Sequence, residues 1–159
     1  MQYFPLNLVS VQYVMATLEN YSGQPSEVQA AVKSEAIQKL GELAASLGAD
    51  IARVADRYQL YVDRQKLTAT ISGISGAIAT AVPVPIVQGL GVLVTLAGSL
   101  FSGISGKNAV KAQAEIQALA LRLQEVQTAI NSLQTPANDS QSLYLIVLIV
   151  GFFLYRIWQ

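Results

Sequence analysis

The side chains that could carry chemistry in this chain are carboxylates, hydroxyls and lysines. The 159 residues include no cysteine and no histidine, which removes the usual general base and the usual ligands of a zinc site. Carboxylates recur on two segments rich in alanine and glutamine, as Glu35, Glu42 and Asp50 on the first and as Glu115 and Glu125 on the second. In that setting they are typical of solvated helix faces. We therefore expect no catalytic residue, no cofactor and no metal site.

A second candidate for chemistry is the pentapeptide Ser-Gly-Ile-Ser-Gly, which occurs at 72–76 and again at 102–106. It lacks the Gly-x-Ser-x-Gly spacing of a nucleophile elbow, and the chain has no histidine to activate a serine. A Walker-type phosphate loop is also missing from the sequence. Ten basic and ten acidic residues cancel, so no net positive field would attract nucleic acid. The sequence predicts a protein that is not an enzyme and does not bind nucleic acid directly.

The central feature of the sequence is the stretch 67–106, which contains no charged side chain and is bounded by Lys66 and Lys107. Pro83 and Pro85 lie near its middle, and proline removes a backbone donor and disfavours helix in the residue before it. A straight helix of this length would reach about 60 Å, roughly twice the hydrocarbon core of a bilayer. We therefore expect a membrane-inserted helical hairpin that bends at the two prolines. A shorter re-entrant wedge is the alternative.

Small residues recur at every fourth position in both halves of this stretch. Such rows let helix backbones approach closely in lipid, where burial of apolar surface supplies no driving force. The residues expected to pack helices in the membrane are Ala69, Gly73, Ala77, Ala81, Gly91, Thr95, Ser99 and Gly103. One hairpin contact cannot use both rows. We therefore expect a homo-oligomer or an assembly with other proteins.

Amphipathic helical patterns lie on both sides of the uncharged stretch. Residues 26–66 contain no proline, and residues 107–134 repeat apolar side chains at alternating steps of three and four, which is a heptad pattern. Gly41 and Gly48 weaken the first helix or mark a close approach of another one. We predict that the two segments pair as an antiparallel coiled coil, and pairing with another chain is the alternative. The predicted seam consists of Leu40, Leu43, Leu47, Ile51, Val54, Tyr58, Ile116, Leu119, Leu123, Val126, Ile130 and Leu133.

Both ends of the chain carry further apolar segments. Residues 1–25 mix the periods of a strand and a helix, and we favour a short amphipathic helix there. A linker at 135–141 contains a proline and polar residues. In the last segment, 142–159, the apolar residues are interrupted by Arg156 and flanked by aromatic side chains that suit the interfaces of a bilayer. We expect a C-terminal transmembrane helix, with a buried core helix as the alternative.

Cations mark the expected membrane boundaries. They are Arg64, Lys66, Lys107, Lys111 and Arg156. Four of them flank the base of the hairpin, and cations favour the cytoplasmic side of a membrane. We therefore expect the base and both flanking segments on the cytoplasmic or particle-interior side, and the hairpin tip on the other side.

The expected fold class is all-α: a long antiparallel hairpin with coiled-coil arms, a membrane-inserted tip and a separate C-terminal transmembrane helix. In layout, residues 26–158 resemble small virion membrane proteins and DNA-ejection proteins of bacterial viruses, which combine glycine-rich membrane helices with alanine- and glutamine-rich coiled coils. The resemblance implies a bacterial inner membrane or a virion-associated membrane. It also implies a lipid bilayer and proteins of a membrane or virion assembly as partners.

These expectations favour a non-enzymatic integral membrane protein that serves as a structural or anchoring component of a larger assembly. One alternative is a pore-forming or membrane-penetrating protein that inserts its hairpin on demand. The other is a soluble helical scaffold that buries the uncharged stretch in an oligomer. The uncharged tip suits both a permanent membrane protein and one that enters a membrane late, because no ion has to be desolvated.

Overall fold

The structure is a computed structural model that describes residues 3–4 and 10–134, and these residues form five helices and no strand. The prediction of an all-helical protein is confirmed for this part of the chain. In order, the helices are α1 (Val11–Asn20), α2 (Ser26–Tyr58), α3 (Arg64–Ile78), α4 (Pro83–Phe101) and α5 (Ala109–Gln134). The predicted linker at 135–141 and the predicted C-terminal helix with Arg156 lie outside the described residues.

The two longest helices, α2 and α5, pack against each other, and we refer to them as the arms. α2 begins directly after Pro25 and carries Glu27 in its first turn, where a negative charge stabilises the helix dipole. It ends at Tyr58, and the next residue, Gln59, has a left-handed backbone with φ 54°. The chain turns back at this point.

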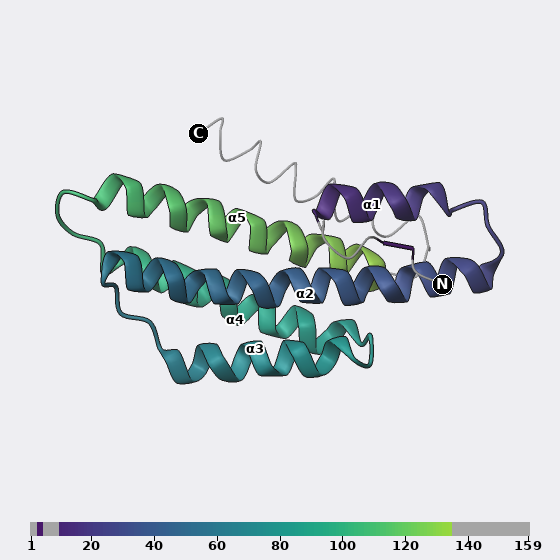
Figure 1. The fold of residues 1–159 in the computed structure, drawn as a ribbon, viewed down its shortest axis with the longest axis horizontal. Helices are drawn as coiled ribbons and strands as arrows, with labels where there is room; N and C mark the ends of the chain where they lie inside the picture. The colour runs from purple at the N-terminus through teal and green to yellow at the C-terminus, as the bar shows by residue number, and fades with distance from the viewer. Residues whose placement is uncertain (1–2, 5–9, 135–159) are drawn as a thin grey trace, which may run out of the picture.

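The next two helices, α3 and α4, form an antiparallel pair that lies along the arms (Figure 1). We refer to this pair as the hairpin. Asp63 caps α3 by accepting a hydrogen bond from a backbone N–H of the first turn. Residues 79–82 make the turn between the two helices, with Ala81 at φ 50°. Pro83 and Pro85 follow this bend and lie in the first turn of α4, where the backbone N–H groups have no helical partner in any case.

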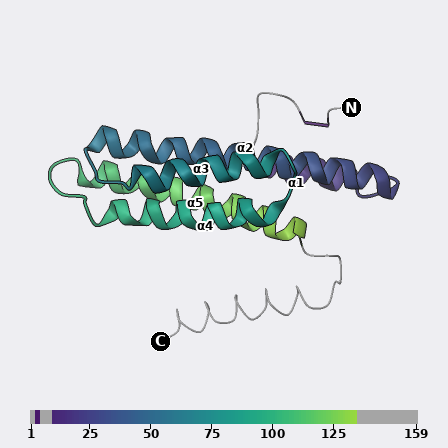
Figure 2. The same ribbon diagram turned by 90° about the horizontal axis from the view of Figure 1, so that it is seen from below.

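Together, α2 to α5 make a four-helix bundle with up-down-up-down connections (Figures 1 and 2). The N-terminal part of α2 runs past the tip of the hairpin, and α1 packs there on α2 and α5 (Figure 1). Phe4 is buried, and its ring meets the edge of Tyr13. The backbone N–H groups of Tyr3 and Phe4 donate to the carboxylate of Glu35 on α2. These contacts hold residues 3–4 at the end of the bundle where α1 packs on α2 and α5.

Two sequence-based expectations need correction. Residues 26–66 do not form one helix, because α2 ends at Tyr58 and residues 59–63 turn the chain. The uncharged stretch also does not extend beyond the arms but folds back along them. The physical reason is that the inner faces of α3 and α4 are apolar, so they bury their side chains against the apolar stripes of the arms.

Candidate functional site

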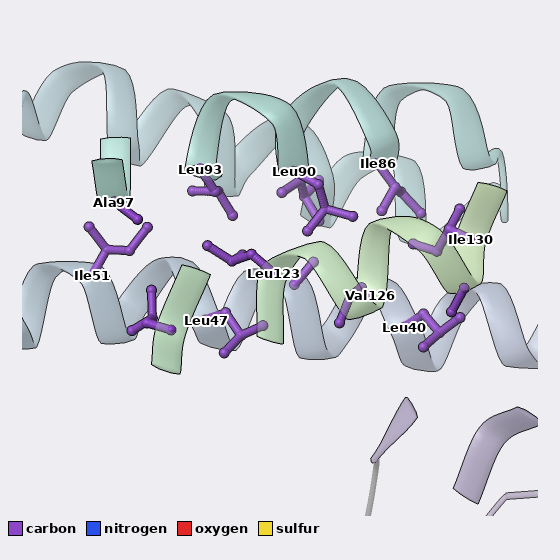
Figure 3. Close-up of a cluster of buried hydrophobic side chains, with 14 of the residues drawn as sticks. Leu40, Leu47, Ile51, Ile86, Leu90, Leu93, Ala97, Leu123, Val126 and Ile130 are labelled. Carbon is purple, nitrogen blue, oxygen red and sulfur yellow. The ribbon is translucent and has the colours of Figure 1, made fainter. Parts of the chain in front are cut away.

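The inner face of α4 occupies the centre of the bundle. Ile86, Leu90 and Leu93 are fully buried and point toward the arms (Figure 3). The side chains of α2 and α5 in the same cluster are Leu40, Leu47, Ile51, Leu123, Val126 and Ile130. All twelve residues of the predicted seam are buried or half-buried, with Leu43 and Tyr58 in the half-buried class. The core that these residues form is shared by the arms and the hairpin.

Three glycines let α3 approach its neighbours closely. A Cβ atom added at Gly48 of α2 would lie 2.7 Å from Cγ1 of Ile71 on α3, and Gly41 meets α3 equally closely. Within the hairpin, a Cβ atom at Gly89 of α4 would lie 2.5 Å from Cγ1 of Ile74. Both distances are shorter than a normal van der Waals contact, so even alanine would push α3 away. The isoleucines of α3 thus pack directly on glycine backbone on two sides.

The predicted small-residue rows do not make these contacts. Five of their eight members are exposed in this bundle, namely Ala69, Gly73, Thr95, Ser99 and Gly103. A Cβ atom added at Gly73 would meet nothing within 4 Å. Ala77 is buried, and Ala81 and Gly91 are half-buried. The rows face mainly outward because the larger apolar side chains of α3 and α4 take the inner face.

The outer face of the hairpin is uncharged from Leu67 to Gly106. Beyond Lys66, the exposed residues of α3 are threonine, alanine, serine and glycine. Among the described residues, α4 is the one helix that is long and apolar enough to cross a membrane, judged by length and composition. Only 39% of its most apolar window is buried, whereas the core helix of a soluble protein is mostly buried. The hairpin therefore presents an uncharged, partly apolar surface to its surroundings.

Both connections between the hairpin and the arms lie at the same end of the bundle (Figures 1 and 2). Residues 59–63 join α2 to α3, and residues 102–108 join α4 to α5. The second connection contains Gly103 and Gly106, and Gly106 has φ 90°. We call this end of the bundle the hinge end. The opposite tip of the hairpin, at 79–82, has no chain connection to the arms.

The bend at Gln59 is a left-handed helix end made by a residue other than glycine. The N–H of Leu60 donates to the carbonyl of Ala55, and the N–H of Gln59 donates to the carbonyl of Asp56, which is a Schellman type of helix end. Glycine usually occupies the left-handed position, and a residue with a Cβ atom costs about 1 kcal/mol or more there. No glycine or proline lies between 49 and 72. No glycine or proline therefore enforces the break, and the local signal for it is Asp63, the N-cap of α3.

Charged side chains at the hinge end join the arms to each other. Nη1 of Arg57 donates to Oε2 of Glu115 at 2.7 Å, and the hydroxyl of Tyr58 donates to Oε1 at 2.7 Å. The hydrogen bond to the Glu115 carboxylate raises the pKa of Tyr58 above its ordinary value of 10.0. Arg64 of α3 pairs with Asp56 of α2. Of these contacts, only the last one crosses from an arm to the hairpin.

Four of the predicted boundary cations come together at the hinge end. Arg64 and Lys66 lie in the first turn of α3. Lys107 lies in the loop before α5, and Lys111 lies in the first turn of α5. All four are exposed. The structure thus gathers the charges that flank the uncharged stretch at the end that carries both connections.

Some of the residues that hold the hairpin were missed by sequence reasoning. Leu67, Ile71, Ile74 and Ile78 recur at steps of four, three and four, and this pattern could have indicated a packed inner face. Gln59 itself carries no such signal, but Asp63 could have indicated that a new helix begins there. Comparisons with protein-family models, curated proteins and solved structures found no match to this chain.

Proposed function

We propose that this protein inserts a helical hairpin into membranes and is not an enzyme. In this proposal the arms hold α3 and α4 in a closed bundle, and the hairpin swings about the hinge end into a bilayer. The observation that carries the proposal is that a hairpin with no charge beyond Lys66 is attached to its arms at one end only. Rotation about 59–63 and 102–108 moves the tip from beside the arms to beyond them. No described segment has to pass through another during this movement.

The composition of the hairpin supports its transfer into lipid. A charge near the bilayer centre costs about 2.5 to 3.5 kcal/mol on insertion scales, whereas the hairpin between Leu67 and Gly106 carries none. α4 has 19 residues, close to the about 20 that a crossing needs. α3 has only 15 residues. This shorter helix fits a bilayer in two geometries, a tilted crossing or a re-entrant wedge.

The conformation of Gln59 supports the same movement. Straightening the chain at 59–63 removes the left-handed backbone and lets α2 and α3 continue as one helix. The left-handed backbone of Gln59 favours the straight form, whereas the Asp63 cap and the packing of the hairpin favour the bent form. A bilayer can replace the packing between the hairpin and the arms. It then shifts the equilibrium toward the straight form, because lipid contacts the hairpin only when the hairpin has left the bundle.

Self-association is part of the proposal. In lipid, the outward glycines and alanines of the hairpin become surfaces on which helices pack closely. Gly73, which touches no other helix in the closed bundle, is the clearest example. We propose a homo-oligomer of inserted hairpins, in the bacterial or virion-associated membrane to which the layout of the chain points.

A permanent anchoring role is the second candidate. The observation that favours it is the apolar sequence at 143–158, which is long enough to tether the chain to a bilayer with some thinning. In that role the bundle serves as a structural component of an assembly, and the hairpin stays closed.

Disulfide locks distinguish the two candidates, because the chain has no native cysteine. Gly48→Cys with Ile71→Cys links α2 to α3, and Gly89→Cys with Ile74→Cys links α3 to α4 as the matched control. Cγ1 of each isoleucine is one bond from its Cβ, so the two Cβ atoms of each pair lie within about 4 Å, as in a disulfide, and replacing the isoleucine also removes the atoms that would clash. We expect oxidation of the first pair to block dye release from liposomes and reduction to restore it. The control pair should release dye in both states, because it closes only the hairpin itself.

Equal dye release by the oxidised and reduced forms of the first pair would contradict hairpin opening. Absence of dye release from the wild type and from both pairs, with the protein still bound to the liposomes, would favour the anchoring role. Circular dichroism of each oxidised and reduced form controls for loss of the helical fold.

A further inference from the structure

The hinge end carries the two most exposed large apolar side chains of the described residues. Tyr61, in the connection between α2 and α3, is 86% exposed, and Val110, at the start of α5, is 78% exposed. Phe101, the last residue of α4, is 41% exposed. None of the three belongs to the buried core. Single exposed apolar residues are ordinary, but three from separate segments at one end indicate an interaction surface.

Positive charge is concentrated at the same end. Residues 56–66 and 107–115 hold five cations and three carboxylates, whereas the other described residues hold four cations and six carboxylates. The hinge end therefore has a net charge of plus two and the rest of the described chain has minus two. The neutral total hides a bundle that is polarised along its long axis.

Three lysines at the hinge end are available to bind anions. Lys66, Lys107 and Lys111 are exposed and make no ion pair with any described residue. Lys107 also lines a cavity of about 280 Å³ between the two hinge connections, together with Leu60 and Ile104. Most of the cavity lining is polar, and Gln59, Ser105 and Asn108 lie beside Lys107 as further hydrogen-bonding groups for an anion.

We infer that the hinge end is a docking surface for anionic lipid headgroups. Tyr61, Phe101 and Val110 enter the interface, and the three lysines hold the phosphates. Tyrosine sits at headgroup level in bilayers, and lysines near an anionic leaflet add to binding. This inference rests on the proposed function and adds a step before insertion: the closed bundle first binds the membrane through its hinge end, and the hairpin opens afterwards. A bilayer fits the surface better than an acidic protein does, because the swinging hairpin enters its target from this end.

A tryptophan reporter separates docking from insertion. Trp158 is the one native tryptophan, so Trp158→Phe with Tyr61→Trp leaves a single reporter at the hinge end. Trp158→Phe with Leu121→Trp gives the matched control, because Leu121 is 54% exposed on α5 away from this end. Each tryptophan variant also carries Gly48→Cys and Ile71→Cys. The disulfide between these two cysteines is oxidised, so that the hairpin stays in the bundle. The vesicles contain brominated phosphatidylglycerol, or brominated phosphatidylcholine as the neutral comparison.

We expect brominated phosphatidylglycerol to quench Tyr61→Trp strongly and Leu121→Trp weakly. Replacing Lys66, Lys107 and Lys111 together by glutamine should raise the lipid concentration for half-maximal quenching about a hundredfold. High salt should act in the same direction. Equal quenching at the two positions would overturn the docking surface, and so would quenching that is the same with neutral lipid.

The same protein distinguishes failure of docking from failure of insertion. Strong quenching of Tyr61→Trp, followed by no dye release after reduction, supports the docking surface and contradicts hairpin opening. Dye release after reduction without quenching in the oxidised form overturns the docking surface and leaves hairpin opening intact. A response of Tyr61→Trp to an acidic protein and not to vesicles also overturns the lipid assignment.

Discussion

The arms and the hairpin contribute to one core but differ on their outer faces. Leu47 and Ile51 of α2 are as deeply buried as Leu90 and Leu93 of α4. Outside, the arms carry lysines, arginines and carboxylates, whereas the hairpin beyond Lys66 carries no charge. Burial inside the bundle therefore does not separate the two pairs of helices. The outer face does, because lipid can replace apolar contacts but cannot solvate charges.

A charge on the outer face of the hairpin is the change expected to break this difference most strongly. Thr95 is exposed on α4, and its hydroxyl bonds only within its own helix, to the carbonyl of Gly91. Thr95→Lys should leave the closed bundle folded but add one charge to the segment that enters lipid. We expect the rate of dye release to fall about a hundredfold, from the cost of one charge on insertion scales.

Gln117→Lys is the matched control for this variant, because Gln117 is exposed on α5. It should release dye at the rate of the wild type. Thermal unfolding in the absence of lipid checks that both bundles are intact. Equal loss of dye release in the two variants would mean that the outer faces of arms and hairpin do not differ in the way proposed.

The bend at Gln59 offers a smaller and opposite change. Gln59→Gly should stabilise the closed bundle by about 1 kcal/mol, because glycine adopts the left-handed backbone without a clash at Cβ. Dye release should slow about fivefold if opening requires this bend to straighten. Urea unfolding measures the first effect, and liposome assays measure the second. Gln59→Ala keeps a Cβ atom and should change neither one, so identical behaviour of the glycine and alanine variants would contradict strain at the hinge.

The contact between Tyr58 and Glu115 belongs to the arms alone and should give the smallest effect. Its hydrogen bond raises the pKa of the Tyr58 hydroxyl, so its stabilising contribution is fully present below pH 10.0 and is lost as pH rises through the raised value. An absorbance titration of the wild type minus Tyr58→Phe should show this raised pKa. Glu115→Gln should lower it. The same shift with and without liposomes is expected, since the arms keep this contact while the hairpin moves.

Helix positions could be predicted from the sequence because the period of apolar residues depends only on local geometry. The seam from Ile116 to Leu133 is an example, since its spacing suits a helix whatever it packs against. The path of the hairpin could not be predicted in the same way. Leu67, Ile71 and Ile74 form an inner stripe that suits both lipid and the core of a bundle. The break at Gln59 was also hidden, because no glycine or proline marks it and only Asp63 indicates that a new helix begins.

The glycines that hold the hairpin against the arms could not be predicted from the sequence either. The small-residue rows around Gly73 and Gly103 predict close packing in lipid, whereas the closed bundle uses Gly41, Gly48 and Gly89. Glycines of both sets look alike in the sequence. Which set faces another helix depends on the rotation of α3 and α4 about their axes, and this rotation follows from the arms that receive them.

The distance between the hairpin tip and α2 tests hairpin opening most directly. Val84 lies beside the tip and Ser34 lies on α2, and both are exposed. In the closed bundle the tip is near Gly41, because a Cβ atom added there would lie 3.2 Å from Cδ1 of Ile86. Opening should move the tip by about twice the length of the hairpin, or roughly 50 Å.

Spin labels on Ser34→Cys and Val84→Cys, measured by pulsed electron paramagnetic resonance, report this distance in one protein. We predict a short distance between the labels in water. Adding anionic liposomes should replace it by a distance that is several tens of ångströms longer, as expected from the displacement of the tip. An unchanged short distance in liposomes that are releasing their dye would contradict hairpin opening.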